Sequence, residues 1–190
     1  MNRLPPKPPS ILRQLRKLGP LSFSQESLWF LYQFDPSNLA YNSTYLFRLK
    51  GGIDHDILEH ALNEIVRRHE ILRTIYPNRG GQPLQAINPY EPFSLNEFDF
   101  SSGPEDEIEL VVTKFALEHG KAPVNLHRGP LTRFALLHVS SKEDYLFFAT
   151  HHISFDAWSR QVLIGELVQL YDAYRLGKNP DMPEFAGTVS

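Results

Sequence analysis

Two adjacent histidines and a nearby aspartate are the part of this sequence best suited to chemistry. They lie in ATHHISFDAWS, residues 149–159, where His151 and His152 follow an apolar run and precede Asp156. Imidazole is the side chain best matched to proton transfer near neutral pH. Because alternate residues of a strand point to opposite faces, we expect one histidine to face a cleft and the other to brace the loop. Asp156 can orient a ring or fix the loop.

The same side chains suit a metal site, because histidine and aspartate both ligate zinc and iron. Such a site needs further ligands. The remaining histidines are scattered and predict no second cluster: His55, His60, His69, His119, His127 and His138. We therefore expect no metal. A serine nucleophile and a phosphate cradle are also disfavoured, because the sequence has no G-x-S-x-G elbow, no Walker A loop and no G-x-G-x-x-G motif.

The composition is that of an ordinary globular protein. The 190 residues suit one domain or one lobe, with 42% hydrophobic and 22% charged residues. A net charge of -3 predicts no nucleic-acid or membrane partner. The absence of cysteine excludes disulfides and thiolate chemistry. The longest apolar runs, such as LWFLY at residues 28–32, are too short for a signal peptide or a span, so we expect a cytoplasmic protein.

Helices and strands are mixed along the chain. Caps and apolar spacing predict four helices. The first is capped by Ser22 or Ser24 and runs to residue 34, the second spans residues 55–66 after the cap Asp54, and the others span residues 104–120 and 159–175. Alternation predicts strands at residues 41–50, 72–76, 82–87, 131–139 and 145–150, with the last two forming a hairpin. Residues 93–100 fit a loop or a short edge strand. The pattern favours an α/β fold, a two-layer sandwich whose mixed sheet is covered by helices on one face.

Three segments resemble motifs of one family. HHISFDAWS, from His151, resembles the HHxxxDG motif of nonribosomal peptide synthetase condensation domains and related acyltransferases. LSFSQESLWFL, residues 21–31, resembles the family's S-x-A-Q-x-R-L-W-x-L. RHEILRTIY, residues 68–76, resembles R-H-E-x-L-R-T-x-F. The segments occur in family order, and the resemblance implies one lobe of a chloramphenicol acetyltransferase-like fold.

The resemblance also suggests how the chain is divided. Residues 21–177 correspond to the amino-terminal lobe of a condensation domain. Residues 1–20 form a proline-rich basic leader, either a linker or a docking segment, in which Arg13, Arg16 and Lys17 fit a short helix. Residues 178–190 are expected to be a loose tail toward the missing carboxy-terminal lobe.

The family joins two groups held as thioesters on the 4'-phosphopantetheine arms of donor and acceptor carrier proteins. The resemblance implies that no cofactor binds the lobe directly. It makes His152 the key residue, which accepts a proton from the attacking amine or positions that amine. His151 would hold the loop. Asp156 would form a structural ion pair with Arg73 or Arg68, since a guanidinium suits a buried carboxylate.

The sequence departs from the family motifs at several positions. The glycine after the motif aspartate is Ala157, which would be strained only if its φ were positive. Ser24 and Ser27 replace the usual alanine and arginine of the first motif. In the motif loop, Trp158 precedes Ser159, and we expect Trp158 to pack in the core rather than to contact substrate.

Two other functions fit the same sequence. One is a related acyltransferase that moves an acyl group from a carrier protein or coenzyme A to an alcohol or amine. The other is a non-catalytic module that binds a carrier protein or a neighbouring synthetase domain. Without its second lobe, the chain would also expose an apolar face that favours self-association.

Overall fold

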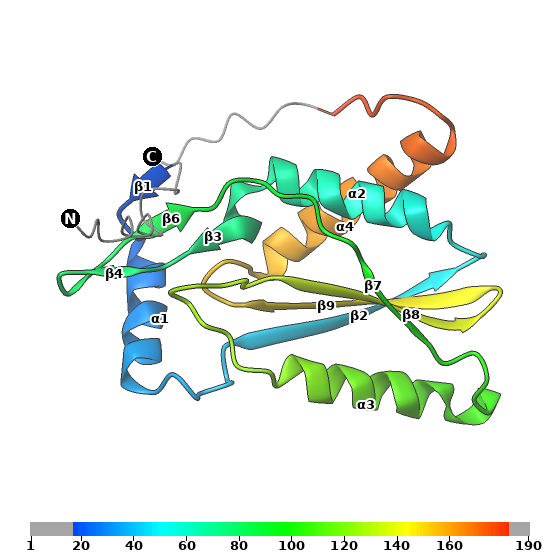
Figure 1. Cartoon of the computed structure of the whole chain (residues 1–190), viewed down its shortest axis with the longest axis horizontal. Coiled ribbons are helices and arrows are strands. Elements are labelled where there is room, and N and C mark those ends of the chain that lie inside the picture. Colours follow the sequence, from blue (N-terminus) through cyan, green and yellow to red (C-terminus); the bar gives the residue numbers. More distant parts are fainter. Residues whose placement is uncertain (1–16, 183–190) are drawn as a thin grey trace, which may run out of the picture.

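The computed structural model describes residues 17–182 (Figure 1). Most of the expected leader, including Arg13 and Arg16, and the tail from residue 183 lie outside the described residues. The parts that are described belong to the folded unit. Lys17–Gly19 form strand β1 of a sheet, and Met182 packs against the main core. The domain limits at residues 21 and 177 stay a prediction.

A four-stranded mixed sheet forms the centre of the fold, in the order β2-β9-β8-β7. Strands β2 (Asn42–Lys50) and β8 (Arg133–Ser140) both pair antiparallel with β9 (Glu143–His151), whereas β7 (Asn96–Asp99) pairs parallel with β8. The expected α/β class, mixed sheet and β8–β9 hairpin are confirmed. Strand β7 shows that residues 93–100 contain an edge strand.

Helices lie on both faces of this sheet. Figure 1 shows α2 (His55–Arg68) and α4 (Ala157–Arg175) on one side and α3 (Ile108–Gly120) on the other. The expectation of helices on one face only was wrong. Consecutive side chains of β8 and β9 are apolar and buried, so each face of these inner strands needs a cover.

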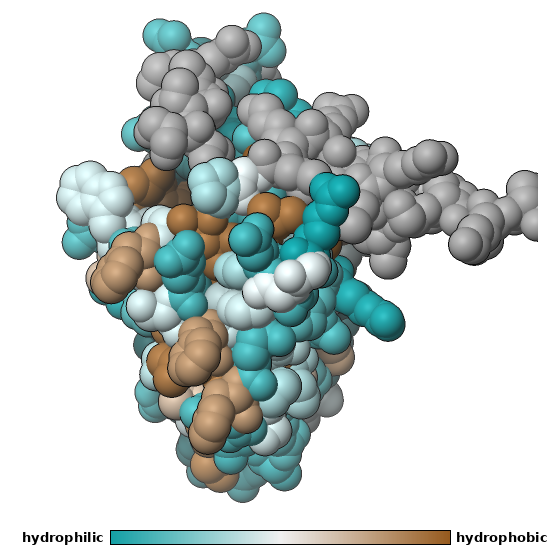
Figure 2. All heavy atoms as spheres, turned by 90° about the vertical axis from the view of Figure 1, so that its left-hand side faces the viewer, coloured by the Kyte–Doolittle hydropathy of each residue, from teal (hydrophilic) through white to brown (hydrophobic). Residues whose placement is uncertain are grey.

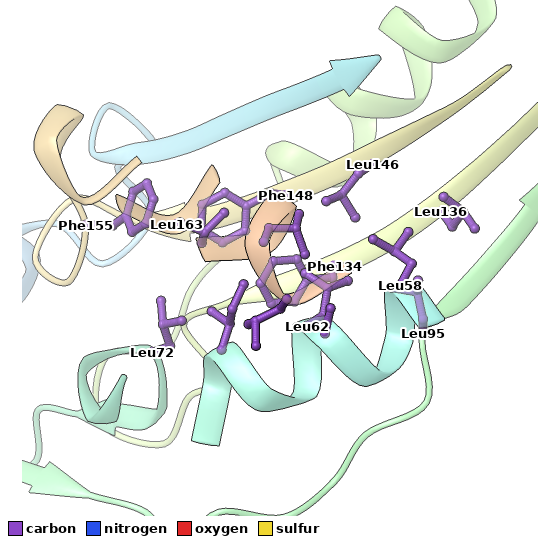
Figure 3. Close-up of a cluster of buried hydrophobic side chains, with 14 residues drawn as sticks. Leu58, Leu62, Leu72, Leu95, Phe134, Leu136, Leu146, Phe148, Phe155 and Leu163 are labelled. Atoms are coloured by element: carbon purple, nitrogen blue, oxygen red, sulfur yellow. The ribbon is translucent and has the colours of Figure 1, made fainter. Parts of the chain in front are cut away.

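The main core lies between the sheet and the α2–α4 pair (Figure 3). Leu58 and Leu62 of α2 point toward Phe134 and Phe148 of the strands, and Leu163 of α4 joins them. A second cluster on the opposite face joins α3 to β8 and β9, and its members are Val112, Phe115, Ala116, Ala135, Leu137, Val139, Phe147 and Ala149. Because both faces of β9 are covered, its position in the sheet is fixed, and so is the position of His151 at its end.

A smaller sheet has the order β1-β6-β3, and its Ile75 and Ala86 pack in one cluster with Ile153, two residues after the end of β9. The expected strand at 72–76 is a 3₁₀ turn, Glu70–Arg73, followed by the short β3, Thr74–Ile75. The expected strand at 82–87 is divided into β5, Gln82–Pro83, and β6, Gln85–Ile87. Strand β5 pairs with β4 (Asn78–Arg79) across the predicted turn.

The first two helices start at predicted capping residues. Helix α1 spans Phe23–Phe34, and Ser22 forms a capping box with Gln25 at its start. Asp54 caps α2 by accepting a hydrogen bond from the Ile57 amide at 3.1 Å. Helix α3 begins only at Ile108, after a 3₁₀ turn. No helix within residues 17–182 has both the length and the apolarity needed to cross a bilayer.

Candidate active site

His151 is the last residue of β9 and is buried. Its side chain is 3% exposed, and its Nδ1 accepts a hydrogen bond from the Ile153 amide at 3.1 Å. Burial, with a smaller effect from the neighbouring charge of His152, lowers the pKa of His151 to about 4. The ring is therefore neutral at neutral pH, and its contact holds the turn that follows the strand.

His152 is exposed and begins the turn toward α4. Its backbone amide donates to the carbonyl of Tyr41 at 2.8 Å, and its Nδ1 lies 2.8 Å from the carbonyl oxygen of Phe155. Because a carbonyl only accepts, Nδ1 must carry the proton in this contact. Nε2 of the neutral ring is then unprotonated, and it has no hydrogen-bond partner among residues 17–182. Nε2 is thus available to accept a proton or a hydrogen bond.

Asp156 is the N-cap of α4. Its Oδ1 accepts hydrogen bonds from the backbone amide and the hydroxyl of Ser159, both at 2.8 Å. These two contacts, the backbone one first, lower the pKa of Asp156. The side chain is exposed and stabilises the start of α4, where backbone amides are otherwise without partners. The aspartate thus fixes the end of the histidine loop.

The expected ion pair between Asp156 and Arg68 or Arg73 is not formed. Arg68 Nε lies 3.5 Å from Glu166 Oε2 instead. Arg73 donates to the carbonyl of Asn88. The physical reason is that Asp156 sits at the exposed start of α4 and is satisfied by Ser159. The carboxylate of α4 that is mostly buried, and therefore in need of a cation, is that of Glu166.

Tyr76 and Gln25, which the sequence did not identify as site residues, hold the histidine loop by hydrogen bonds. Tyr76 is fully buried, and its hydroxyl lies 3.1 Å from Ser154 Oγ and 3.3 Å from the Ile153 carbonyl. Gln25 Nε2 donates to the Tyr76 hydroxyl at 3.2 Å and to the Ile153 carbonyl at 3.4 Å. Burial raises the pKa of Tyr76 to about 12, so the hydroxyl keeps its proton.

These contacts bring the three sequence motifs together. Gln25 belongs to the first motif, Tyr76 ends the second, and Ile153 lies in the third. The Tyr76 carbonyl also accepts from Trp29 Nε1 at 3.2 Å and from His127 Nδ1 at 2.9 Å. The motif positions were visible in the sequence, but the hydrogen bonds between motifs depend on pairings that no local pattern encodes.

A family model described as "Condensation domain" matches residues 16–187. The chain belongs to the condensation-domain family. Curated relatives include a linear gramicidin synthase protein of Brevibacillus parabrevis, which is 39% identical over 87% of this chain and 2% of that protein. Phosphinothricin tripeptide synthetase PhsB of Streptomyces viridochromogenes is 34% identical over 87% of this chain and 14% of its own length.

Solved condensation domains share the fold. The starter condensation domain of rhizomide synthetase RzmA has a TM-score of 0.81 and 24% identity over 90% of this chain and 41% of its own. The first condensation domain of the calcium-dependent antibiotic synthetase, in complex with substrate analogue 3a, has a TM-score of 0.79 and 23% identity over 88% of this chain and 41% of its own. The chain thus spans less than half of these condensation-domain structures.

The departures from the condensation-domain motif are mild in this fold. No described residue other than glycine has a positive φ, so Ala157 at the start of α4 is not strained. Trp158 is 72% exposed, and the expectation that it packs in the core was wrong. As the second residue of α4 it lines an open cavity of about 350 Å³ together with His69 and Phe155.

The expectation that the other histidines form no cluster was also wrong. His55 and His138 converge on Asp144, although they are far apart in the sequence. No local pattern indicates this meeting, because the three residues come from a helix and two strands. This cluster is separate from the His152 loop, which lies at the other end of β9.

Proposed function

We propose that this chain is the amino-terminal lobe of a nonribosomal peptide synthetase condensation domain, and that it contributes the catalytic histidine for amide bond formation. The observation that carries the proposal is the hydrogen bonding of the two ring nitrogens of His152. Its Nδ1 is held by the Phe155 carbonyl, and its Nε2 has no partner within residues 17–182, on a loop held by contacts between the three motifs. The relatives named as peptide synthetases support the same function.

In the proposed reaction the amine of an acceptor-bound substrate attacks the carbonyl of a donor-bound thioester. His152 Nε2 accepts a hydrogen bond from the amine and takes its proton as the C–N bond forms. The C–S bond then breaks, and the departing thiolate receives a proton. A thioester is already activated, so alignment of the two substrates supplies much of the acceleration. His151 is neutral and buried, and its role is to hold the loop.

Both substrates reach the site on 4'-phosphopantetheine arms of carrier proteins, so no cofactor binds the lobe itself. A second lobe completes the substrate tunnel, in agreement with the share of the solved condensation domains that this chain covers.

Helix α1 carries an apolar stripe that is open in this lobe, where Phe23, Phe30 and Phe34 are 85%, 66% and 86% exposed (Figure 2). A second lobe, a carrier protein or another copy of the chain would cover such a surface. We place this activity in the cytoplasm.

A single-turnover condensation assay tests the proposal. Donor-loaded and acceptor-loaded carrier proteins are mixed with the chain, with and without the second lobe of a related condensation domain, and the products are read by intact mass spectrometry. We expect product only with the second lobe, and loss of product in His152→Ala. His60→Ala, an exposed histidine of α2, is the matched control.

Three results would contradict the proposal. Equal turnover by His152→Ala would remove that side chain from the chemistry. Carrier binding without turnover in any combination would instead favour the non-catalytic interaction module. Transfer to an alcohol, or from coenzyme A, in preference to the carrier-bound amine would favour the related acyltransferase.

A further inference from the structure

A second group of titratable side chains lies at the end of β9 opposite to His152. His55 is the first residue of α2, His138 lies near the end of β8, and Asp144 lies near the start of β9. With about 3.3 Å per residue of strand, Asp144 is roughly 20 Å from the histidine loop. One potential ligand atom from each of the three side chains lies within 4.8 Å of the other two.

We propose that His55 Nε2, His138 Nδ1 and Asp144 Oδ1 bind a divalent transition-metal ion of the zinc type. His138 Nδ1 lies 2.7 Å from Asp144 Oδ1, and His55 Nε2 lies 3.6 Å from the same oxygen. A tetrahedral ion with bonds of about 2.0–2.2 Å separates its ligand atoms by roughly 3.3–3.6 Å. The His55 contact already has nearly that spacing. The His138 contact opens by about half an ångström when the ion replaces the shared proton.

A carboxylate behind His55 orients its ring for this role. Glu97 Oε2 lies 3.0 Å from His55 Nδ1, the nitrogen that faces away from Asp144. Since a carboxylate accepts, this contact places the proton on Nδ1 and leaves Nε2 of the neutral ring free to ligate. Metal-bound histidines usually donate their second ring nitrogen in this way. Glu97 is thus a positioning residue that supports the site independently of the three ligand atoms.

Burial at the site favours a cation. Asp144 is 2% exposed, and its carboxylate lies between the imidazole rings of His55 and His138. A buried carboxylate is costly unless a positive charge is close by. A bound dication supplies that charge.

The strands hold two of the ligands rigidly. His138 and Asp144 are directly opposite each other in the β8–β9 register, and the register shifts between His138 and Ser140. Such bulges re-aim side chains and are frequent beside functional sites. Two imidazoles and one carboxylate suit zinc, cobalt, nickel or copper better than calcium or magnesium, which prefer oxygen ligands. Three protein ligands leave a fourth position for water or another ligand.

Metal titration of the tag-free chain tests this proposal. After removal of metal with a chelator, zinc is titrated by calorimetry, and cobalt is titrated by its visible absorption as a report on tetrahedral coordination. We expect one ion per chain. Glu97→Gln should weaken zinc binding by about 10–100-fold, the usual effect of losing such a carboxylate. His55→Ala should weaken it at least as much, because it removes a ligand directly.

His60→Ala serves as the matched control, because it removes an exposed histidine from the same helix without touching the cluster. Its zinc affinity should equal that of the unaltered chain. Circular dichroism confirms that each variant is folded. The proposal is overturned if the unaltered chain shows no one-to-one zinc binding, or if His55→Ala binds zinc as tightly as His60→Ala.

Discussion

Removal of one hydroxyl should loosen the histidine loop. Tyr76→Phe keeps the ring of a fully buried residue but deletes the group that contacts Ser154 Oγ, the Ile153 carbonyl and Gln25 Nε2. The change leaves no large cavity, so its cost comes from hydrogen bonding. If the loop is held as described, both the stability of the chain and the placement of His152 depend on this hydroxyl.

The size of the effect follows from what the deletion leaves behind. A typical hydrogen bond contributes about 0.5–1.5 kcal/mol, and a buried polar group without a partner costs about 1–3 kcal/mol. Ser154 is 5% exposed, so its hydroxyl is such a group. We therefore expect Tyr76→Phe to lower the free energy of unfolding by about 1.5–3 kcal/mol. For a chain of this size that corresponds to a Tm lower by about 3–12 °C.

Urea denaturation with a double-mutant cycle measures this directly. Ser154→Ala removes the stranded hydroxyl, so Tyr76→Phe should cost less in that background. The coupling energy should be about 1 kcal/mol. Tyr32→Phe is the matched control on the same side of the fold, because the Tyr32 hydroxyl has no hydrogen-bond partner among residues 17–182. Its effect should stay within about 0.5 kcal/mol.

Two outcomes would refute the reasoning. The first is a cost for Tyr76→Phe no greater than that of Tyr32→Phe. The second is strict additivity of Tyr76→Phe and Ser154→Ala, which would mean that the two hydroxyls do not share a hydrogen bond. In the condensation assay, Tyr76→Phe should also slow turnover while His152 is intact, because the loop that carries His152 is less well held.

Three further predictions follow from individual contacts. The pKa of His151 is about 4 in the folded chain and 6.5 in the unfolded chain, so the unfolded chain binds the proton at higher pH. The free energy of unfolding should therefore decrease by about 3 kcal/mol as the pH falls from 6.5 to 4. His151→Asn, which can still accept from the Ile153 amide, should flatten that slope in pH-dependent urea melts, and an unchanged slope would contradict the assignment. Asp156→Ala should cost about 1 kcal/mol as a lost N-cap, with Asp156→Asn nearly neutral, whereas a loss of about 3–5 kcal/mol in both would indicate a buried ion pair. Gly120→Ala should destabilise by about 1–3 kcal/mol, because its new Cβ would meet the Thr44 side chain, and Thr44→Ala should relieve part of that cost in thermal melts.

The sequence predicted the elements whose signals are local. Ser22 and Asp54 are capping residues, and both start helices as expected. The hairpin of β8 and β9 follows from two apolar runs separated by a short polar turn. The two histidines were expected directly after an apolar run, and in the structure His151 ends β9 and His152 follows it.

The errors concern features that depend on distant residues. The family resemblance paired Asp156 with an arginine, but the direction of α4 exposes Asp156 and buries Glu166. Trp158 was placed in the core from its type alone, although its position in the first turn of α4 turns it outward. The proximity of His55 and His138 depends on the strand register and on where α2 begins. The spacing of histidines in the sequence predicts neither.

The pairing of β2 with β9 has a consequence for synthesis of the chain. Their register runs from Asn42 opposite His151 to Lys50 opposite Glu143, so an early strand pairs with a late one. Ribosomes add about 5–20 residues per second, and β2 leaves the tunnel seconds before its partner exists. During that interval β2 has no strand partner, and Tyr45, Phe47 and Leu49 have no sheet core to pack against. We therefore expect the lobe to assemble late and cooperatively, when β9 emerges, with the loop that carries His152 among the last segments to find its place.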